Sequence, residues 1–183
     1  MQRTIFRSLF LTILACAGIP QQLLRGQEAA PIPDVGRMTD IPGAHETPDP
    51  RLDYKIVFEL NSAAEQADAI NPGLTTIAAL VNTFAHYGVG PAHRHFVAIF
   101  HGPTVDLVTK DDSYRKTHQG HSNPNVRLMK ALTASGVQLV VCGQSALQHH
   151  IDPKTIQPDV QLNFSATVTL MNLETEGYVK VDE

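Results

Sequence analysis

The sequence lacks most of the features that identify common protein classes. Its 183 residues include only two cysteines, Cys16 and Cys142. After the N-terminal segment there is no second long apolar run, no internal repeat and no basic stretch interleaved with aromatic residues. Without Arg3 and Arg7 of that segment, 12 basic residues remain against 18 acidic ones, a net charge near −6. We therefore expect no nucleic-acid partner.

The N-terminal segment, residues 1–17, has the pattern of a secretory signal. Arg3 and Arg7 form a basic start without acidic residues, and Ser8 to Ala15 is an apolar run too short to span a bilayer. Ile13-Leu14-Ala15-Cys16 resembles a bacterial lipobox, which predicts a lipid anchor on Cys16 as the only membrane attachment. Ala15-Cys16-Ala17 equally fits ordinary cleavage between small residues. Both interpretations predict export to the periplasm of a bacterium.

Residues 18–52 are rich in proline and lack sustained periodicity. This composition predicts a linker or irregular arm, which either holds the domain away from a membrane or wraps a neighbouring subunit. The folded domain is expected to span residues 53–183, about the usual size for one core.

Strand-like and helix-like segments alternate within this domain. Strands are expected at 54–60, 94–100, 137–141 and 178–181, and helices at 71–87, 124–135, shortly after 142, and at 165–176. We expect the polar stretch 110–123 to form a surface loop and 153–158 to be irregular. The alternation predicts an α/β fold with a mostly parallel sheet and helices on both faces.

The end of one predicted strand carries the most informative residue, Cys142. Gly143-Gln144-Ser145 follows as a turn that opens a helix, so backbone amides and the helix dipole would favour a thiolate and hold a small anion on the sulfur. His101-Gly102 ends the preceding strand and is expected at the same edge, with His101 as a proton partner. The alternative is a small buried hydrophobe, because the apolar residues before Cys142 would raise its pKa if the sulfur faced the core.

Several segments together resemble the DsrE/DsrF-like family of sulfur-relay proteins, and most closely its exported members. They span about 54–181 and read Lys55-Ile56-Val57-Phe58, Ile99-Phe100-His101-Gly102-Pro103, Asn123-Pro124-Asn125, the strand 137–141 with Cys142-Gly143-Gln144-Ser145-Ala146, and Gly177-Tyr178. The resemblance implies a three-layer α/β fold, a homotrimer or homohexamer, and no cofactor. It also implies that Cys142 carries persulfide sulfur between a donor and an acceptor protein, with Gly102, Asn123, Gly143, Gln144 and Ser145 around the ligand.

Three function classes follow from these residues. The first is an exported sulfur carrier or sulfurtransferase-like protein that uses Cys142 and His101. The second is a binding module for a small ligand or metal, because thiolate and imidazole together suit zinc or copper. No histidine pair forms a recognised metal motif, so no metal ligand is assigned. The third is an oligomeric structural or partner-binding protein in which Cys142 is only packed.

Overall fold

A single parallel sheet organises the computed structural model, which describes residues 32–181. The expected signal segment and the first part of the linker lie outside these residues. The five strands are β1 (Tyr54–Leu60), β2 (Arg94–Phe100), β3 (Gln138–Cys142), β4 (Val160–Asn163) and β5 (Val179–Val181), in the order β4-β3-β2-β1-β5. All neighbouring strands run parallel, as the sequence predicts.

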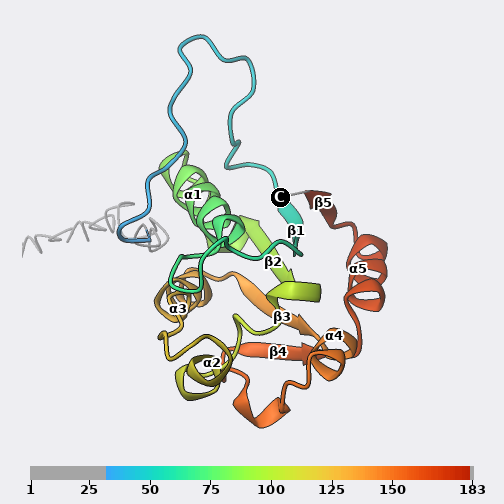
Figure 1. Cartoon of the computed structure of the whole chain (residues 1–183). Helices are drawn as coiled ribbons and strands as arrows, with labels where there is room; N and C mark the ends of the chain where they lie inside the picture. Colours follow the sequence, from blue (N-terminus) through green and yellow to red (C-terminus); the bar gives the residue numbers. More distant parts are fainter. Residues whose placement is uncertain (1–31, 182–183) are drawn as a thin grey trace, which may run out of the picture.

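Helices cover both faces of the sheet and give the fold three layers (Figure 1). One face is covered by α1 (Pro72–His86) and α3 (Val126–Ala134), and the other by α5 (Ala166–Thr175). The described residues also contain two shorter helices, α2 (Asp111–Thr117) and α4 (Gly143–Gln148). Three 3-10 turns are present as well: η2 (Pro91–His93), η3 (Gly102–Thr104) and η4 (Pro153–Thr155). Within 32–181 no helix has the length and apolar composition needed to cross a membrane.

The strands alternate between two hydrophobic clusters. In β1, Phe58 and Leu60 face α1 and α3, whereas Val57 faces α5. In β3, Val141 belongs to the first cluster and Cys142 to the second. Because side chains alternate along a strand, a buried parallel strand needs apolar residues on both faces, which explains the nearly continuous apolar runs.

The crossover from β4 to β5 explains why α5 covers the face of the sheet opposite α1 and α3. Strands β1 to β4 follow one another across the sheet, but β5 lies on the far side of β1. Right-handed parallel crossovers that run in opposite directions place their helices on opposite faces. The helix α5 must therefore span the sheet on the face opposite α1 and α3.

Helix boundaries follow the expected capping chemistry. The side chain of Asn71 accepts a hydrogen bond from Leu74 N, and Pro72 occupies the first turn of α1. Ser165 caps α5 in the same way by accepting from Val168 N at 3.1 Å. The helices predicted at 71–87 and 165–176 are thus confirmed.

The prediction of a surface loop over 110–123 is wrong for its first half, where α2 forms. Asp111 and Asp112 lie in the first turn and Arg115 and Lys116 in the last, which complements the helix dipole. Arg115 Nε also donates to Asp111 Oδ2 at 2.7 Å, a pair four residues apart. The helix is held by charge pairing and by one buried side chain, Tyr114, and not by an apolar stripe.

The strand β4 was not predicted. It has four residues, and only Val160 is buried. Its alternation Val160-Gln161-Leu162-Asn163 covers only four residues, the shortest run that can indicate a strand, so the signal is weak. Its pairing places Asn163 beside Cys142, so this short strand borders the thiol.

The described part of the Pro-rich segment, 32–52, lies partly against α1 and then projects as a loop (Figure 1). Ile32 is buried, and the buried side chain of Asn82 holds its backbone through Oδ1 to Ile32 N at 2.7 Å and Nδ2 to Ile32 O at 3.1 Å. Asn82 Nδ2 also donates to Val35 O at 2.8 Å. These bonds fix the start of the segment on the domain.

Candidate functional site

Two strand ends meet at the carboxyl edge of the sheet, on the face that α5 covers. The register pairs Phe100 with Val141, so the next residues along, His101 and Cys142, follow at the same level on neighbouring strands. Ile99 and Cys142 both belong to the cluster on the α5 face, and His101 continues the extended backbone two residues after Ile99. The topology thus brings His101 and Cys142 to one edge and one face.

Cys142 ends β3 and caps α4. Its Sγ accepts a hydrogen bond from Ser145 N at 3.4 Å, and the residue is only 4% exposed. The following helix has six residues, so its dipole is small and the nearby amides matter more. The sulfur therefore lies below the surface, within a set of hydrogen-bond donors.

Burial and hydrogen bonding act in opposite directions on this thiol. Burial raises the pKa of Cys142, because it disfavours the charged form. The Ser145 hydroxyl lowers that pKa, as do the backbone amides of Ser145, Ala166 and Gln144. The donors outweigh burial, and the pKa of Cys142 lies below its ordinary value.

The contribution of Ala166 was not anticipated from the sequence. Ala166 is the first residue of α5, so the starts of two helices, α4 and α5, converge on one sulfur. The first amides of a helix lack intrahelical partners, which leaves them free to bond a thiolate. Residue 166 lies 24 positions beyond Cys142, and no local pattern links the two.

Gly143 allows the chain to pass close to the connection between β4 and α5. A Cβ at this position would lie 2.6 Å from Asn163 O and 3.2 Å from Phe164 O. Both contacts are to backbone atoms, which cannot move aside cheaply. Gly143 thus lets the turn after Cys142 lie directly against the neighbouring strand end.

Ser145 connects the thiol to the end of β2. Its buried Oγ accepts a hydrogen bond from Gly102 N at 3.2 Å. Gly102 has φ of +58°, a conformation that favours glycine and turns this amide toward Ser145. Cys142 and three of the residues expected around a ligand, Gly143, Ser145 and Gly102, therefore adjoin one another.

His101 has a carboxylate as its neighbour. Its Nε2 lies 3.0 Å from Glu59 Oε1, and Lys180 Nζ lies 2.6 Å from Glu59 Oε2. His101 is not among the groups that lower the pKa of Cys142. The cluster Glu59, His101 and Lys180 comes from the ends of β1, β2 and β5, and the sequence analysis identified only its histidine.

Two other expected ligand residues have different positions. Asn123 is buried, and its Nδ2 donates to Leu107 O at 2.7 Å and Thr109 O at 3.0 Å, which holds the loop after η3. The side chain of Gln144 is exposed, and only its backbone amide acts on the thiol. Asn123 therefore has a structural role in this geometry.

The histidines do not gather into a metal site. Over residues 32–181 no group of three or more histidine, cysteine, aspartate or glutamate side chains is placed to hold an ion. His118 lies 2.8 Å from Asp106 and stacks on Tyr114, and His93 bonds Asp53 at 2.6 Å.

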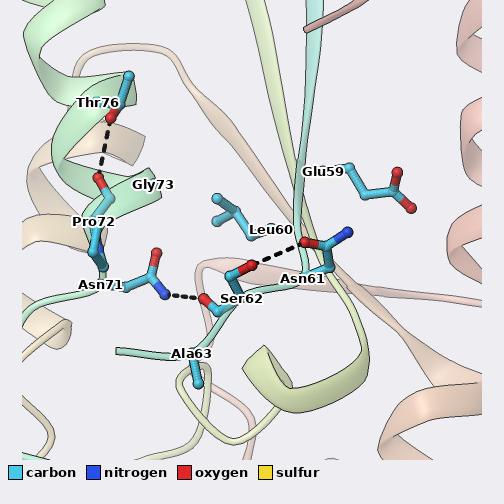
Figure 2. Close-up of a pocket in the computed structure, with 9 residues that line it drawn as sticks. All are labelled: Glu59, Leu60, Asn61, Ser62, Ala63, Asn71, Pro72, Gly73 and Thr76. Carbon is cyan, nitrogen blue, oxygen red and sulfur yellow. Dashed lines mark hydrogen bonds between the residues drawn. The ribbon is translucent and has the colours of Figure 1, made fainter. Parts of the chain in front are cut away.

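A small pocket opens beside the end of β1, between the loop after that strand and the start of α1 (Figure 2). It has a volume of about 160 Å³ and mostly apolar walls, and neither Cys142 nor His101 lines it. Figure 2 shows the Glu59 carboxylate pointing away from Asn71 and Thr76 of the α1 side. The pocket and the thiol are therefore separate features of the same edge.

Comparison with known proteins now identifies the fold family. The model of the DsrE/DsrF-like family matches residues 54–181. The chain belongs to this family. The DsrE family is linked to sulfur relay, and Cys142 lies within the matched residues.

A solved structure supports the fold of this DsrE-like domain. The protein of unknown function MTH1491 from Methanobacterium thermoautotrophicum is similar, with a TM-score of 0.53 and 18% sequence identity over 72% of this chain and 100% of that chain. None of the curated proteins matches the chain. At this identity the similarity shows the three-layer α/β fold alone.

Proposed function

We propose that this DsrE-like protein is an exported sulfur carrier that holds persulfide sulfur on Cys142, with a sulfurtransferase-like reaction. The observation that carries the proposal is the convergence of donors from α4 and α5 on Cys142 Sγ. Such donors stabilise a thiolate, which is the nucleophile in sulfur exchange. They would equally stabilise the anion of a persulfide.

The reaction is an exchange of one sulfur atom. The Cys142 thiolate attacks the outer sulfur of a donor persulfide, a new S–S bond forms, and the S–S bond of the donor breaks. The donor leaves as a thiolate and takes up a proton, and Cys142 is left as a persulfide. Attack by an acceptor thiolate on the outer sulfur reverses these steps and regenerates the Cys142 thiolate.

Mass spectrometry of the protein and of its proteolytic peptides tests this proposal. After exposure to polysulfide, a Cys16→Ser variant should gain the mass of one sulfur on the peptide that contains Cys142. A Cys16→Ser/Cys142→Ser variant should gain none. Failure of the first variant to gain sulfur, with Cys142 open to alkylation only after denaturation, would make Cys142 a packing residue.

Export is proposed from the N-terminal sequence. The mature chain is expected to begin at Cys16 with acyl chains or shortly after Ala17. N-terminal mass analysis of protein from a bacterial periplasm or membrane fraction measures this directly. Intact Met1 on cytoplasmic protein would contradict it.

We also propose that the protein is a homotrimer or homohexamer, and that α5 lies in the interface. The helix is apolar on two sides: Leu170 and Leu173 pack on the sheet, while Val168 and Met171 are exposed. Phe164, two residues before the helix, is also 73% exposed. Apolar residues on two opposite sides of a helix favour contacts on both of those sides.

The composition of this stretch favours contact between identical copies. Residues 160–173 contain no charged side chain, so two copies would meet there without opposing like charges. Met171→Lys should lower the assembly state in analytical ultracentrifugation. Thr76→Lys, which adds the same charge to the exposed side of α1, should leave it unchanged. A monomeric parent protein at micromolar concentration would refute the proposal.

A further inference from the structure

We infer that Glu59 holds His101 in place as the base that takes the proton from an acceptor thiol when sulfur leaves Cys142. This inference rests on the proposed sulfur-carrier function and assigns two further roles in it. His101 acts on the thiol of the acceptor, and Glu59 is the positioning residue of His101. Both roles follow from the side chains that share the α5 face of the carboxyl edge.

Side chains from neighbouring strands stand next to one another on this face. The register pairs Cys142 with Asn163 of β4 and places it level with His101, the residue after β2. His101 N donates to Leu60 O at 3.1 Å, so the backbone at His101 continues the ladder with β1. Cys142 therefore has Asn163 on one side and His101 on the other. Of these two neighbours, the histidine is the one that can take up a proton.

A carboxylate orients the imidazole of His101. Nε2 lies 3.0 Å from Glu59 Oε1, and Lys180 Nζ lies 2.6 Å from Glu59 Oε2. A carboxylate only accepts hydrogen bonds, so it favours the ring proton on Nε2 and leaves Nδ1 as the nitrogen that can take up another. A base that is held by a third group is the arrangement that activates nucleophiles in many enzymes.

The titratable groups that face His101 come from three strands. The strand β1 presents Glu59, β5 presents Lys180 behind that carboxylate, and β3 presents Cys142. The helix α5 packs on this face with apolar side chains, followed by Tyr178. Glu59 is therefore the carboxylate in contact with the ring, and Lys180 balances its charge.

The position of His101 suits a second thiol better than Cys142 itself. The hydrogen bonds that favour the Cys142 thiolate come from other residues, and His101 is not among them. During transfer the acceptor sulfur, the transferred sulfur and Cys142 Sγ form a row, so the acceptor sulfur lies two S–S lengths, about 4 Å, from Sγ. Neighbouring strands are about 4.8 Å apart, which brings that sulfur within reach of the side chain on the next strand. The His101 side chain is 30% exposed, so an incoming thiol meets it at the surface.

The transfer step balances with the thiol of an acceptor protein as the co-reactant. The S–H bond of the acceptor breaks, and its proton passes to His101 Nδ1. The electron pair left on that sulfur forms an S–S bond to the outer sulfur of the Cys142 persulfide, and the S–S bond within that persulfide breaks. The acceptor sulfur is oxidised to the persulfide level as Cys142 is reduced to the thiolate. The imidazolium then gives its proton to water.

Discharge of sulfur tests the inference on the full chain with Cys16→Ser. The protein is loaded with sodium polysulfide, separated from it by gel filtration, and mixed with a peptide that has one cysteine. At pH 7 a thiol with the ordinary pKa of about 8.5 is about 3% ionised, so a base can accelerate its attack by at most about thirtyfold. In the mass of the intact protein, His101→Ala should lose sulfur about tenfold more slowly than the parent, and Glu59→Gln about threefold more slowly.

Matched variants and a second pH separate a base from a structural effect. His121→Ala and Glu65→Gln make the same changes at exposed loop positions and should discharge like the parent. At about pH 10 the acceptor thiol is already ionised, so His101→Ala and Glu59→Gln should also match the parent there.

The outcomes of this experiment are distinct. Parental discharge by His101→Ala at pH 7, or equal slowing at both pH values, would overturn the inference but leave the carrier function standing. Parental discharge by a folded Glu59→Gln would overturn the role of Glu59. A parent protein that takes up no sulfur from polysulfide would remove the carrier function itself.

A measurement on the unaltered cluster covers the case in which Glu59→Gln does not fold. Nitrogen-15 NMR of the histidine-labelled Cys16→Ser protein should place the proton of the neutral His101 ring on Nε2, beside Glu59. A proton on Nδ1 would leave free only the nitrogen that faces Glu59, and would overturn the inference.

Discussion

Ser145→Ala should raise the pKa of the Cys142 thiol. In the folded protein Ser145 Oγ accepts from Gly102 N at 3.2 Å. The hydroxyl proton is then free to donate to Cys142 Sγ, and this side-chain bond lowers the pKa of the thiol. Alanine removes the hydroxyl donor but retains the backbone N–H that also bonds the sulfur.

The size of the effect follows from the number of donors. A hydrogen bond to a charged group contributes about 1.5–3 kcal/mol, and 1.36 kcal/mol corresponds to one pKa unit. Sulfur is a weak acceptor, and the amides of Ser145, Ala166 and Gln144 remain, so the lower end applies. We expect the pKa of Cys142 to rise by about one unit.

The expected change in alkylation rate is smaller than the change in thiolate fraction. One pKa unit reduces the thiolate fraction about tenfold at a pH below both pKa values. A more basic thiolate is also a better nucleophile, with a Brønsted coefficient of about 0.4–0.5. The rate with iodoacetamide should therefore fall about threefold at low pH and rise about threefold once the thiol is fully ionised.

A pH profile of iodoacetamide labelling in the Cys16→Ser background measures the pKa directly. Gln144→Ala is the matched control, because its exposed side chain is lost while its amide stays, and its midpoint should equal that of the parent. Ser145→Thr restores a hydroxyl and should restore much of the shift. An unchanged midpoint in a folded Ser145→Ala variant would refute the role of the hydroxyl.

Two further predictions concern stability. Gly143→Ala should lower the free energy of unfolding by about 1–3 kcal/mol, because the new Cβ would lie 2.6 Å from Asn163 O. Gly90→Ala is the control: its Cβ would have open space, and the free energy of unfolding should change by less than about 0.5 kcal/mol. Urea denaturation measures both. Asn82→Ala should cost about 1–3 kcal/mol and increase hydrogen exchange of the segment that starts at residue 32, since buried backbone groups lose their partners. Thr76→Ala on the exposed side of α1 is its control, and equal exchange in the two variants would contradict the anchoring role.

The parallel sheet was predictable because its central strands carry strong local signals. The runs 54–60, 94–100 and 137–141 are apolar on both faces, and glycine or proline marks the ends of the helices between them. The missed elements lack such signals. β4 buries one residue, Val160, and α2 depends on paired charges such as Asp111 and Arg115.

The site was predictable where its residues follow one another in the chain or end predicted strands of the parallel sheet. Cys142, Gly143 and Ser145 form one turn, so their proximity required no tertiary information. Glu59 is the neighbour of His101 because of the register between β1 and β2, which the sequence does not specify. Its one sequence signal is an acid between the apolar residues Phe58 and Leu60, where a charge is costly without a partner.

The topology explains why the start of α5 contributes to the environment of the Cys142 thiol. The helix begins where β4 ends, beside Cys142, and leads to β5, whose Lys180 lies 2.6 Å from Glu59. Its first residue, Ala166, supplies an amide to the thiol and belongs to the same buried cluster as Cys142. A contact on the exposed stripe of α5 would hold this helix in place. Assembly through that stripe would therefore stabilise the thiolate environment, and loss of assembly in Met171→Lys should also raise the pKa of Cys142, which the same iodoacetamide profile would detect.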